Sequence, residues 1–327
     1  MTTVYLTIDT EYSSGLVSDL SVVDRAENYA RSIAAITPDG PAGISHQLKL
    51  FEEHGIKAVF FVDPMPAMVW GVAAIEDVVG PIMEAGQDVQ LHCHTEWLEL
   101  AGPDAVITDY TGANLKDFAF EEQCRILEYA RDTLVAAGAP DPVAFRAGNY
   151  GADNATLRAL AELGIKYDSS HCPAMEDGGA CGIDLGPEDR SPVLIDGVVE
   201  VPVGSIGAMG GGLRHVQITA LSLREMCAAL RHARDTKDPY FTLVSHSFEL
   251  INRRTLAVNK VVRRRFAGLC RELASMRGIR TGNYRDDPPS IDAPAQSGLQ
   301  EPLPANPIRT GLRVAEQVVS NTLYGAL

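Results

Sequence analysis

The sequence has little that would place it in a membrane or outside the cell. No apolar run approaches the roughly 20 residues that a membrane-spanning helix requires. The opening residues, MTTVYLTIDT, have the pattern of a strand and lack the basic segment followed by an apolar one that marks a secretory signal. The six cysteines show neither CxxC spacing nor a regular framework, which predicts reduced thiols. We therefore expect a cytoplasmic protein without a membrane span.

Positive charge is also scarce. Lysine and arginine together number 28 against 43 aspartates and glutamates, so the formal net charge is −15. This balance argues against a nucleic-acid partner and against electrostatic binding to acidic membranes, although it is compatible with a cationic substrate. We interpret the acidity chiefly as a contribution to solubility. The composition, 46% hydrophobic and 22% charged, is that of a globular protein that can bury a full core.

Short apolar runs alternate with longer amphipathic segments over most of the chain. The apolar runs predict strands at 4–9, 58–62, 89–92, 143–147, 166–168, 198–203 and 241–246. The amphipathic segments predict helices at 44–53, 75–84, 120–137, 154–163, 223–233 and 258–276. This alternation is typical of parallel βα units, which form a barrel or a doubly wound sheet. The length of 327 residues suits one α/β barrel with long rim loops.

Three long segments interrupt the alternation, at 13–43, 101–116 and 172–191. Long connections that follow strand ends usually shape the rim of an active site. After residue 285 the sequence changes to a Pro-rich linker, which is followed by RTGLRVAEQVVSNTLYGAL, the pattern of an amphipathic helix. We therefore divide the chain into a barrel at 1–285 and a tail at 286–327, whose helix docks on the barrel or joins a partner.

The ends of two predicted strands carry side chains that suit a metal. The first strand ends in TIDTEY, with Asp9 and Glu11 two residues apart, and the third ends in LHCHTEW, with His92, His94 and Glu96 at the same spacing. Residues two apart on an extended chain point to the same side, and the carboxyl ends of parallel strands gather on one face of a barrel. Carboxylates and imidazoles delivered to that face suit zinc or another divalent transition metal.

Later strand ends add polar groups to the same face. Arg146 precedes a Gly-Asn-Tyr-Gly turn, and an arginine there can hold a catalytic carboxylate ionised by a bidentate contact. The backbone N–H groups of Asn149 and Tyr150 in this turn suit a developing oxyanion. Asp168 ends the fifth strand, where it either contacts substrate or caps a turn. His246 ends the seventh strand, where an imidazole can protonate a leaving amine.

In this order, the segments TIDTE, LHCHTEW, FRAGNYG with ELGIKYDSS, and TLVSHSFEL resemble the successive motifs of the polysaccharide deacetylase family, which is carbohydrate esterase family four of the NodB-homology type. The resemblance extends over residues 3–285. It implies a distorted (β/α)7 barrel, TIM-like, with one divalent metal, commonly zinc, held by an acidic residue and two histidines. It also implies that Asp9 is the general base, that Arg146 tethers this base, and that His246 is the general acid.

The sequence departs from the family pattern at the metal motifs. The family's first motif has two adjacent aspartates, of which the second binds metal; Thr10 stands at this place here, so we assign the ligand role to Glu11. The second motif usually has histidines four residues apart, whereas this chain has His92 and His94, with Glu96 at the fourth step. Glu11, His92 and His94 are the preferred ligands, and Glu96 is the alternative to His94. The variant resembles an intracellular branch of the family more than its secreted members.

These features predict a metal-dependent hydrolase that removes an acyl group, an acetyl group by family, from an amide nitrogen of a carbohydrate or related substrate. Two alternatives stay open. An amidohydrolase-type barrel acting on a small linear or cyclic amide would also use an HxH pair, although that family carries the pair near its first strand. A non-catalytic binding module would fit the replacement at Thr10, and metal content would separate it from an enzyme. A homo-oligomer is compatible with the sequence, and His171 and His215 lie on loops that could touch substrate.

Overall fold

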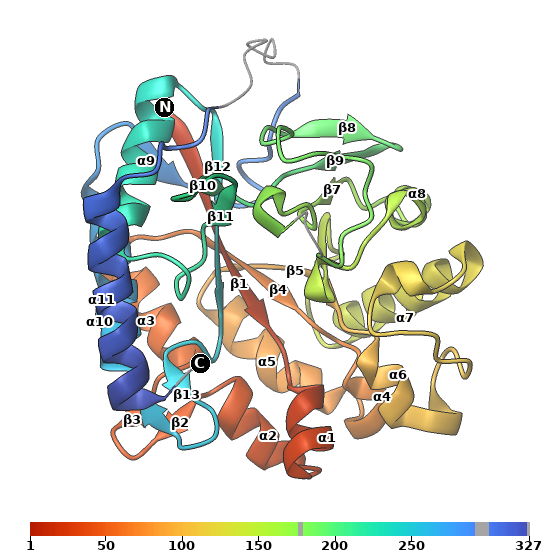
Figure 1. Cartoon of the computed structure of the whole chain (residues 1–327). Helices are drawn as coiled ribbons and strands as arrows, with labels where there is room; N and C mark the ends of the chain where they lie inside the picture. The colour runs from red at the N-terminus through yellow and green to blue at the C-terminus, as the bar shows by residue number, and fades with distance from the viewer. Residues whose placement is uncertain (176–178, 292–300, 326–327) are drawn as a thin grey trace.

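The computed structural model describes residues 1–175, 179–291 and 301–325. Its centre is a curved, mainly parallel sheet surrounded by helices (Figure 1). Parallel strands cross this sheet in the order β12, β1, β4, β5, β6, β7 and β9. In chain order they are β1 (Thr2–Thr10), β4 (Ala58–Val62), β5 (Asp88–Cys93), β6 (Ala144–Ala147), β7 (Tyr167–Asp168), β9 (Val198–Glu200) and β12 (Tyr240–His246). Each of them coincides with a strand that the sequence predicted.

The central strands are buried along their whole length because both faces of the sheet are covered. Every residue of β1 and β4 is buried, as expected for parallel strands with helices outside and packed side chains inside. Alternate residues join different clusters: Tyr5 and Phe61 pack with Tyr284, whereas Leu6 and Phe60 belong to the larger core shared with the helices. The smaller cluster fills the space inside the curved sheet.

The sheet closes into a distorted barrel through loop contacts rather than through a continuous ladder. The segment after β9 approaches β12, where the Gly204 amide donates to the Thr242 carbonyl oxygen at 3.0 Å. The Ile218 amide also donates to the Val244 carbonyl oxygen at 3.0 Å. A Cβ atom on Gly204 would lie 2.6 Å from the Thr242 carbonyl oxygen, so this close approach requires glycine. The predicted TIM-like barrel is therefore confirmed, with an irregular seam between β9 and β12.

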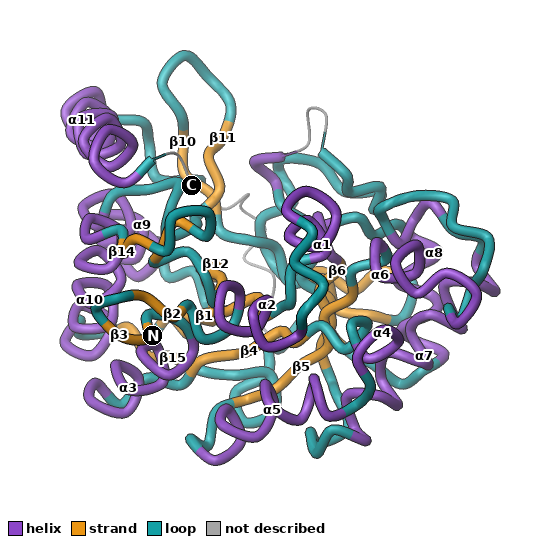
Figure 2. Tube along the Cα trace, turned by 90° about the horizontal axis from the view of Figure 1, so that it is seen from below, coloured by secondary structure: helices purple, strands orange, loops and turns teal. Residues whose placement is uncertain are grey.

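Helices cover the outside of the sheet. In both views α3, α9 and α10 lie on one side of the molecule, and α7 and α8 lie on the other (Figures 1 and 2). Asp153 caps α8 and Ser222 caps α9, each by accepting a hydrogen bond from the amide three residues later. The helices that the sequence predicted are α3 (Ile44–His54), α5 (Ala73–Glu84), α7 (Phe120–Ala136), α8 (Asn154–Glu162), α9 (Leu223–Thr236) and α10 (Lys260–Ser275).

The long connections contain short elements that the sequence analysis did not predict. In chain order these are α1 (Ser14–Leu20), α2 (Arg25–Ser32), β2 (Ile36–Thr37), β3 (Gly40–Pro41), α4 (Ala67–Trp70), α6 (Glu96–Ala101), β10 (Ser205–Gly207), β11 (Leu213–His215), β13 (Ile251–Asn252) and β14 (Ala257–Val258). Two more strands extend the main sheet: β8 (Val193–Ile195) pairs antiparallel with β9, and β15 (Ile279–Thr281) pairs parallel with the start of β1. These pieces are too short to show a clear hydrophobic period.

Two further expectations can be compared with the fold. The described ranges hold no helix with the length and apolar character that a bilayer crossing requires. All six cysteines are unpaired, and Cys93, Cys172, Cys227 and Cys270 are buried.

The terminal helix α11 (Pro307–Tyr324) docks along α10 on the outside of the barrel (Figure 1). Glu316 of α11 pairs with the buried Arg265 of α10 at 3.1 Å, and Ser320 accepts a hydrogen bond from Asn259 at 2.8 Å. Ser320 is the one fully buried residue of this helix, and most of its other side chains are exposed. The contact between α11 and the barrel is therefore chiefly polar.

We predict that a chain shortened to residues 1–290 folds and keeps the metal-binding capacity of the full chain, with lower thermal stability. Arg265 and Asn259 would lose partners in buried positions, and each buried donor left without its partner costs about 1–3 kcal/mol. Thermal unfolding should therefore begin several degrees earlier. Calorimetry and metal analysis check both parts. Failure of the shortened chain to fold would mean that α11 belongs to the barrel core.

Candidate active site

Strand register brings the predicted polar residues to one end of the barrel. Asp9 of β1 lies directly beside His246 of β12, and His92 of β5 lies beside Arg146 of β6. Only β4 separates β1 from β5. A side chain that follows the end of β1 can therefore reach across the end of β4 to β5, and this is the path that Glu11 takes.

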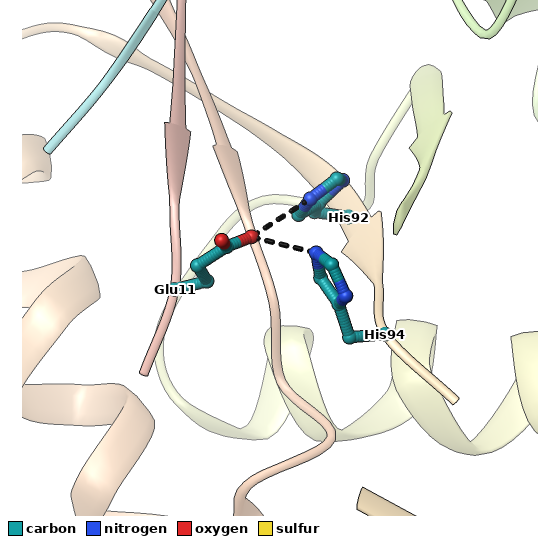
Figure 3. A group of neighbouring side chains, drawn as sticks. All are labelled: Glu11, His92 and His94. Carbon is teal, nitrogen blue, oxygen red and sulfur yellow. Dashed lines mark hydrogen bonds and ion pairs between the residues drawn. The ribbon is translucent and has the colours of Figure 1, made fainter. Parts of the chain in front are cut away.

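Glu11, His92 and His94 form a compact group at this end of the barrel. One carboxylate oxygen of Glu11 lies 3.1 Å from His92 Nε2 and 2.8 Å from His94 Nε2. Figure 3 shows the carboxylate directed toward both rings from the opposite strand. Each residue offers one potential ligand atom, and these atoms lie within 4.8 Å of one another. The structure thus brings together the three residues that the sequence analysis preferred as ligands.

Contacts on the far side of each imidazole orient these rings. His92 Nδ1 lies 2.7 Å from the Arg146 carbonyl oxygen, and His94 Nδ1 lies 3.2 Å from a carboxylate oxygen of Glu96. A carbonyl oxygen can only accept, so Nδ1 of His92 carries a proton, and Nε2 is the ring nitrogen that faces Glu11. Metal-ligating histidines commonly have such acceptors on their second nitrogen. Glu96 therefore lies behind His94 rather than in the ligand group.

The donor set fits a divalent cation. Burial raises the pKa of Glu11, but the facing imidazoles, His94 first, outweigh it and lower the pKa well below its ordinary value. Burial likewise lowers the pKa of His94, but Glu11 and Glu96 together raise it well above its ordinary value. A proton on His94 thus supplies a positive charge between the carboxylates of Glu11 and Glu96. A divalent ion would take the place of that proton, and two imidazole nitrogens with one carboxylate suit zinc.

A second cluster links Asp9 to Arg146 across the inside of the barrel. Arg146 Nη1 donates to Asp9 Oδ1 at 2.7 Å and to Thr7 at 2.8 Å. The rest of the guanidinium donates to the Ser169 carbonyl and hydroxyl oxygens, each at 3.0 Å. The guanidinium also lies over the Phe61 ring, 4.5 Å from its centroid. Because Arg146 is fully buried and its donors are matched, it fixes the position of the Asp9 carboxylate.

His246 lies on the other side of Asp9, with its own carboxylate partner. His246 Nε2 is 3.8 Å from Asp9 Oδ2, and His246 Nδ1 is 3.2 Å from Glu249 Oε1. Burial alone would lower the pKa of His246, but the charges of Glu249 and Asp9 raise it to about 9. The imidazole is therefore protonated near neutral pH and can act as an acid. The sequence analysis missed Glu249, although its position three residues after His246 was a readable signal.

Glu249 is held in place by four donors. The Thr219 hydroxyl donates to its Oε1 at 3.0 Å, and the Gln217 amide donates to the same oxygen. The Ser245 hydroxyl and the His246 amide each donate to Oε2 at 3.0 Å. Burial raises the pKa of Glu249, but His246 and these donors lower it below its ordinary value. Glu249 is thus a fixed negative charge behind the imidazole.

The Gly-Asn-Tyr-Gly turn at 148–151 lies next to the group formed by Glu11, His92 and His94. A Cβ atom on Gly148 would lie 2.7 Å from His94 Nδ1, so glycine lets the turn approach the ring. Asn149 and Tyr150 both have positive φ, 55° and 58°, a strained backbone that costs about 1–3 kcal/mol per residue and often marks functional sites. In the described chain neither of their amides donates to a backbone carbonyl, so both are available to a ligand. The Asn149 side chain donates to Glu96 at 3.1 Å.

Asp168 does not join the group at the mouth of the barrel. It is fully buried and accepts a hydrogen bond from the Ser170 hydroxyl at 2.7 Å, and Ser170 in turn accepts from the Ala147 amide at 2.9 Å. Asp168 also lies beside Glu200 in the paired strands β7 and β9. Burial raises the pKa values of both carboxyl groups, which favours a shared proton. These contacts support β6 rather than a substrate.

The two loop histidines lie in different surroundings. His171 is buried, with Nε2 3.1 Å from the Gly186 carbonyl oxygen, and burial lowers its pKa. His215 Nε2 lies 2.8 Å from the side-chain oxygen of Gln217, which itself contacts the His246–Glu249 pair. His215 is therefore connected to the site through Gln217. His171 instead contacts the loop that contains Gly186.

Asp63 is a further acidic residue that sequence reasoning missed. It follows β4, between the two strands that carry Glu11 and the histidines. The Asp63 amide donates to the Thr10 carbonyl oxygen at 3.1 Å, and its Oδ1 accepts from the His94 amide at 3.4 Å. Burial raises the pKa of Asp63 to about 7, and within the described residues its Oδ2 has no hydrogen-bond partner. A cation close by would help to keep this carboxylate ionised.

Comparisons with known proteins support the fold. No protein-family model matches the sequence, and no curated protein matches it. Among solved structures, a presumed polysaccharide deacetylase from Mycobacterium smegmatis aligns with a TM-score of 0.52 and 19% identity over 85% of both chains. The 4-alpha-glucanotransferase from Thermococcus litoralis has a TM-score of 0.50 and 12% identity over 86% of this chain and 39% of that chain.

A family 4 carbohydrate esterase from Streptomyces lividans, solved with acetate, has a TM-score of 0.44 and 11% identity over 86% of this chain and 92% of that chain. The predicted resemblance to the polysaccharide deacetylase barrel is thus confirmed in the fold, which the chain shares with the Mycobacterium smegmatis protein. A glucanotransferase has a similar barrel, so the reaction has to be argued from the side chains of the site.

Proposed function

We propose that this chain is a metal-dependent hydrolase of the polysaccharide deacetylase family, which removes an acetyl group from an amide nitrogen of a carbohydrate. One observation carries the proposal: a ligand group of Glu11, His92 and His94 adjoins a separate pair formed by Asp9 and His246. The two groups share the end of β1, where Asp9 and Glu11 are two residues apart. A structural ion pair would need only one of these clusters.

The ligand group would hold one divalent metal through the carboxylate of Glu11 and the Nε2 atoms of His92 and His94. We take zinc as the preferred ion, because the donors are two imidazole nitrogens and one oxygen. When bound, the ion would polarise the acyl carbonyl and acidify the attacking water. The arrangement of Glu96 behind His94 would orient that ring and make it a better ligand.

Asp9 is suited to the role of general base. Its Oδ1 is occupied by Arg146, whereas its Oδ2 faces the mouth of the barrel at 3.8 Å from His246 Nε2. The arginine keeps the carboxylate oriented, and Oδ2 can take a proton from the attacking water. Asp9 is 3% exposed, so bulk water competes little for this oxygen.

His246 is suited to protonate the leaving nitrogen. It is charged near neutral pH, and Glu249 fixes the proton-bearing ring from behind. The available amides of Asn149 and Tyr150 would stabilise the developing oxyanion. The proposed base and acid therefore lie side by side at one end of the barrel, with Asp9 Oδ2 3.8 Å from His246 Nε2.

The test of the function is acetate release. We expect the purified protein to release acetate from an N-acetylated amino sugar or its oligomer. Chelation followed by dialysis should abolish the release, and stoichiometric zinc should restore it. Acetate release, measured against the metal content of each sample, checks the prediction. Undiminished hydrolysis after the metal content falls to zero would contradict a metal-dependent reaction.

We further predict a pH effect for Glu249→Gln. The acid acts while His246 is protonated, so the rate should fall as the pH rises through the pKa of His246, which its carboxylate neighbours raise to about 9. Removing the Glu249 charge lowers this pKa, so the alkaline limb should move to lower pH while the acidic limb stays in place. The pH dependence of kcat/KM checks this, and an unchanged alkaline limb would argue that another group is the acid.

A further inference from the structure

A hollow of about 320 Å³ lies beside the proposed acid. Glu249 and Gln217 line it on the side of the reaction centre, and Phe248, Arg253 and Arg254 line it on the side of the β13–β14 hairpin. Glu249 and Gln217 also contact His246. A substrate that reaches His246 can therefore extend into this hollow.

Two ring contacts connect Arg253 in the hollow to the site. The Phe248 ring lies 5.2 Å from the His246 ring, centroid to centroid. The guanidinium of Arg253 lies over the same Phe248 ring, 3.9 Å from its centroid. Arg31 donates to the Arg253 carbonyl oxygen at 3.1 Å, which anchors the hairpin turn. The guanidinium is thus held one aromatic ring away from the imidazole.

The guanidinium of Arg253 forms no ion pair or hydrogen bond with any described residue, and the charge that acts on it from farther away is that of Glu11. In the described chain no carboxylate or carbonyl oxygen lies within hydrogen-bond or ion-pair distance of its guanidinium, although the side chain is half-buried. Buried Arg146 and Arg265, by contrast, have acceptors on more than one nitrogen. Burial lowers the pKa of Arg253, and Glu11 acts in the opposite direction. Within the described residues no N–H group of this guanidinium has a hydrogen-bond acceptor, so these donors can bind a ligand.

The hollow offers no acidic group to satisfy these donors. Its only carboxylate among the lining residues is Glu249, whose two oxygens already accept four hydrogen bonds. Arg254 adds a second, exposed guanidinium beside Arg253. Arg253 and Arg254 are thus adjacent in the chain and both line the hollow. They make the hollow locally positive next to a reaction centre rich in carboxylates.

We propose that Arg253, with Arg254 at the rim, binds an anionic group of the substrate, a carboxylate or a phosphate, in the hollow beside His246. This inference rests on the proposed function and adds the charge of the substrate to it. Planar N–H pairs of an arginine match the oxygen pairs of both anions. The anion would lie on the leaving-amine side of the reaction centre, because Phe248 joins Arg253 to the acid.

A kinetic comparison tests the charge preference. We would measure kcat/KM for N-acetylglucosamine, its 6-phosphate and the corresponding uronic acid, using the metal-loaded full chain. We expect the wild type to prefer at least one anionic substrate over the neutral sugar by roughly 10–100-fold, the range of a charge-assisted hydrogen bond. Arg253→Met should bring this ratio close to one, chiefly through KM, and Arg253→Lys should keep part of it. Arg264→Met, which removes an exposed arginine from the outside of α10, should leave the ratio unchanged.

A binding experiment separates this inference from the proposed function. Calorimetric titration with glucosamine 6-phosphate and with glucosamine needs no turnover, and both the wild type and Arg253→Met keep the metal group. Tighter binding of the phosphate by the wild type, lost in Arg253→Met, would support the anion site even if no acetate is released. Hydrolysis of the neutral sugar with no anion preference, or an equal phosphate affinity in both proteins, would overturn the anion site and leave the hydrolase assignment standing.

Discussion

Replacing His92 or His94 with alanine is expected to remove the bound metal and reduce acetate release to background. Each ring contributes one Nε2 atom to the proposed ligand group, which has three ligand atoms among the described residues. Even loss of an outer partner of a ligand typically lowers metal affinity by 10–100-fold, so we expect loss of a ligand to lower it by about 100-fold or more. Metal content after dialysis and acetate release measure the two effects. Full metal retention in both variants would contradict the ligand assignment.

Two further variants sharpen this experiment. Glu96→Gln should keep stoichiometric metal with weaker affinity, because Glu96 contacts the far nitrogen of His94 rather than the ligand group. A loss as complete as that of His92→Ala would instead make Glu96 the ligand. His54→Ala is the matched control, since His54 lies at the end of α3 and forms none of the site contacts. A metal-free wild-type protein after dialysis would favour the non-catalytic binding module.

Much of the site could be predicted from the residues that stand at the ends of the predicted strands. Asp9, Glu11, His92 and His94 follow buried strands, and parallel strands have their carboxyl ends on one face. The same reasoning predicted that Arg146 and His246 lie at this face, although it could not give the distances between the side chains. The barrel was predictable for a related reason, since the strands and the main helices have clear hydrophobic periods.

The remaining features depend on contacts between distant segments. The spacing rule for an extended chain fails at Glu96, because α6 begins at this residue and turns the side chain to the outer face of His94. Asp168 was predicted either to contact substrate or to cap a turn, and pairing of β7 with β9 buries it beside Glu200. Gln217 reaches His246 from a loop 29 residues earlier in the chain. No local sequence pattern predicts a contact between residues so far apart in the chain.

The second prediction with a large expected effect concerns Asp9 and His246, and it should distinguish the general base from the general acid. We expect Asp9→Asn to keep its metal, because ligation falls to Glu11, His92 and His94, and to lose about 10²–10⁴-fold in turnover. Asparagine preserves the shape beside Arg146, and circular dichroism together with metal analysis controls for misfolding. Turnover close to that of the wild type would mean that another group accepts the proton.

His246→Ala should lose a similar factor on an N-acetyl substrate, whose amine leaves only when protonated, and far less on an aryl acetate, whose phenolate leaves without a proton. Asp9→Asn should be slow on both substrates, because both need an activated water. The ratio of the two rates in each variant therefore distinguishes the roles without assuming how fast the wild type is. Equal losses on both substrates for His246→Ala would contradict the acid role and indicate that the histidine acts by positioning Asp9, which lies 3.8 Å from it. The acid would then be sought at His215, which reaches the same pair through Gln217.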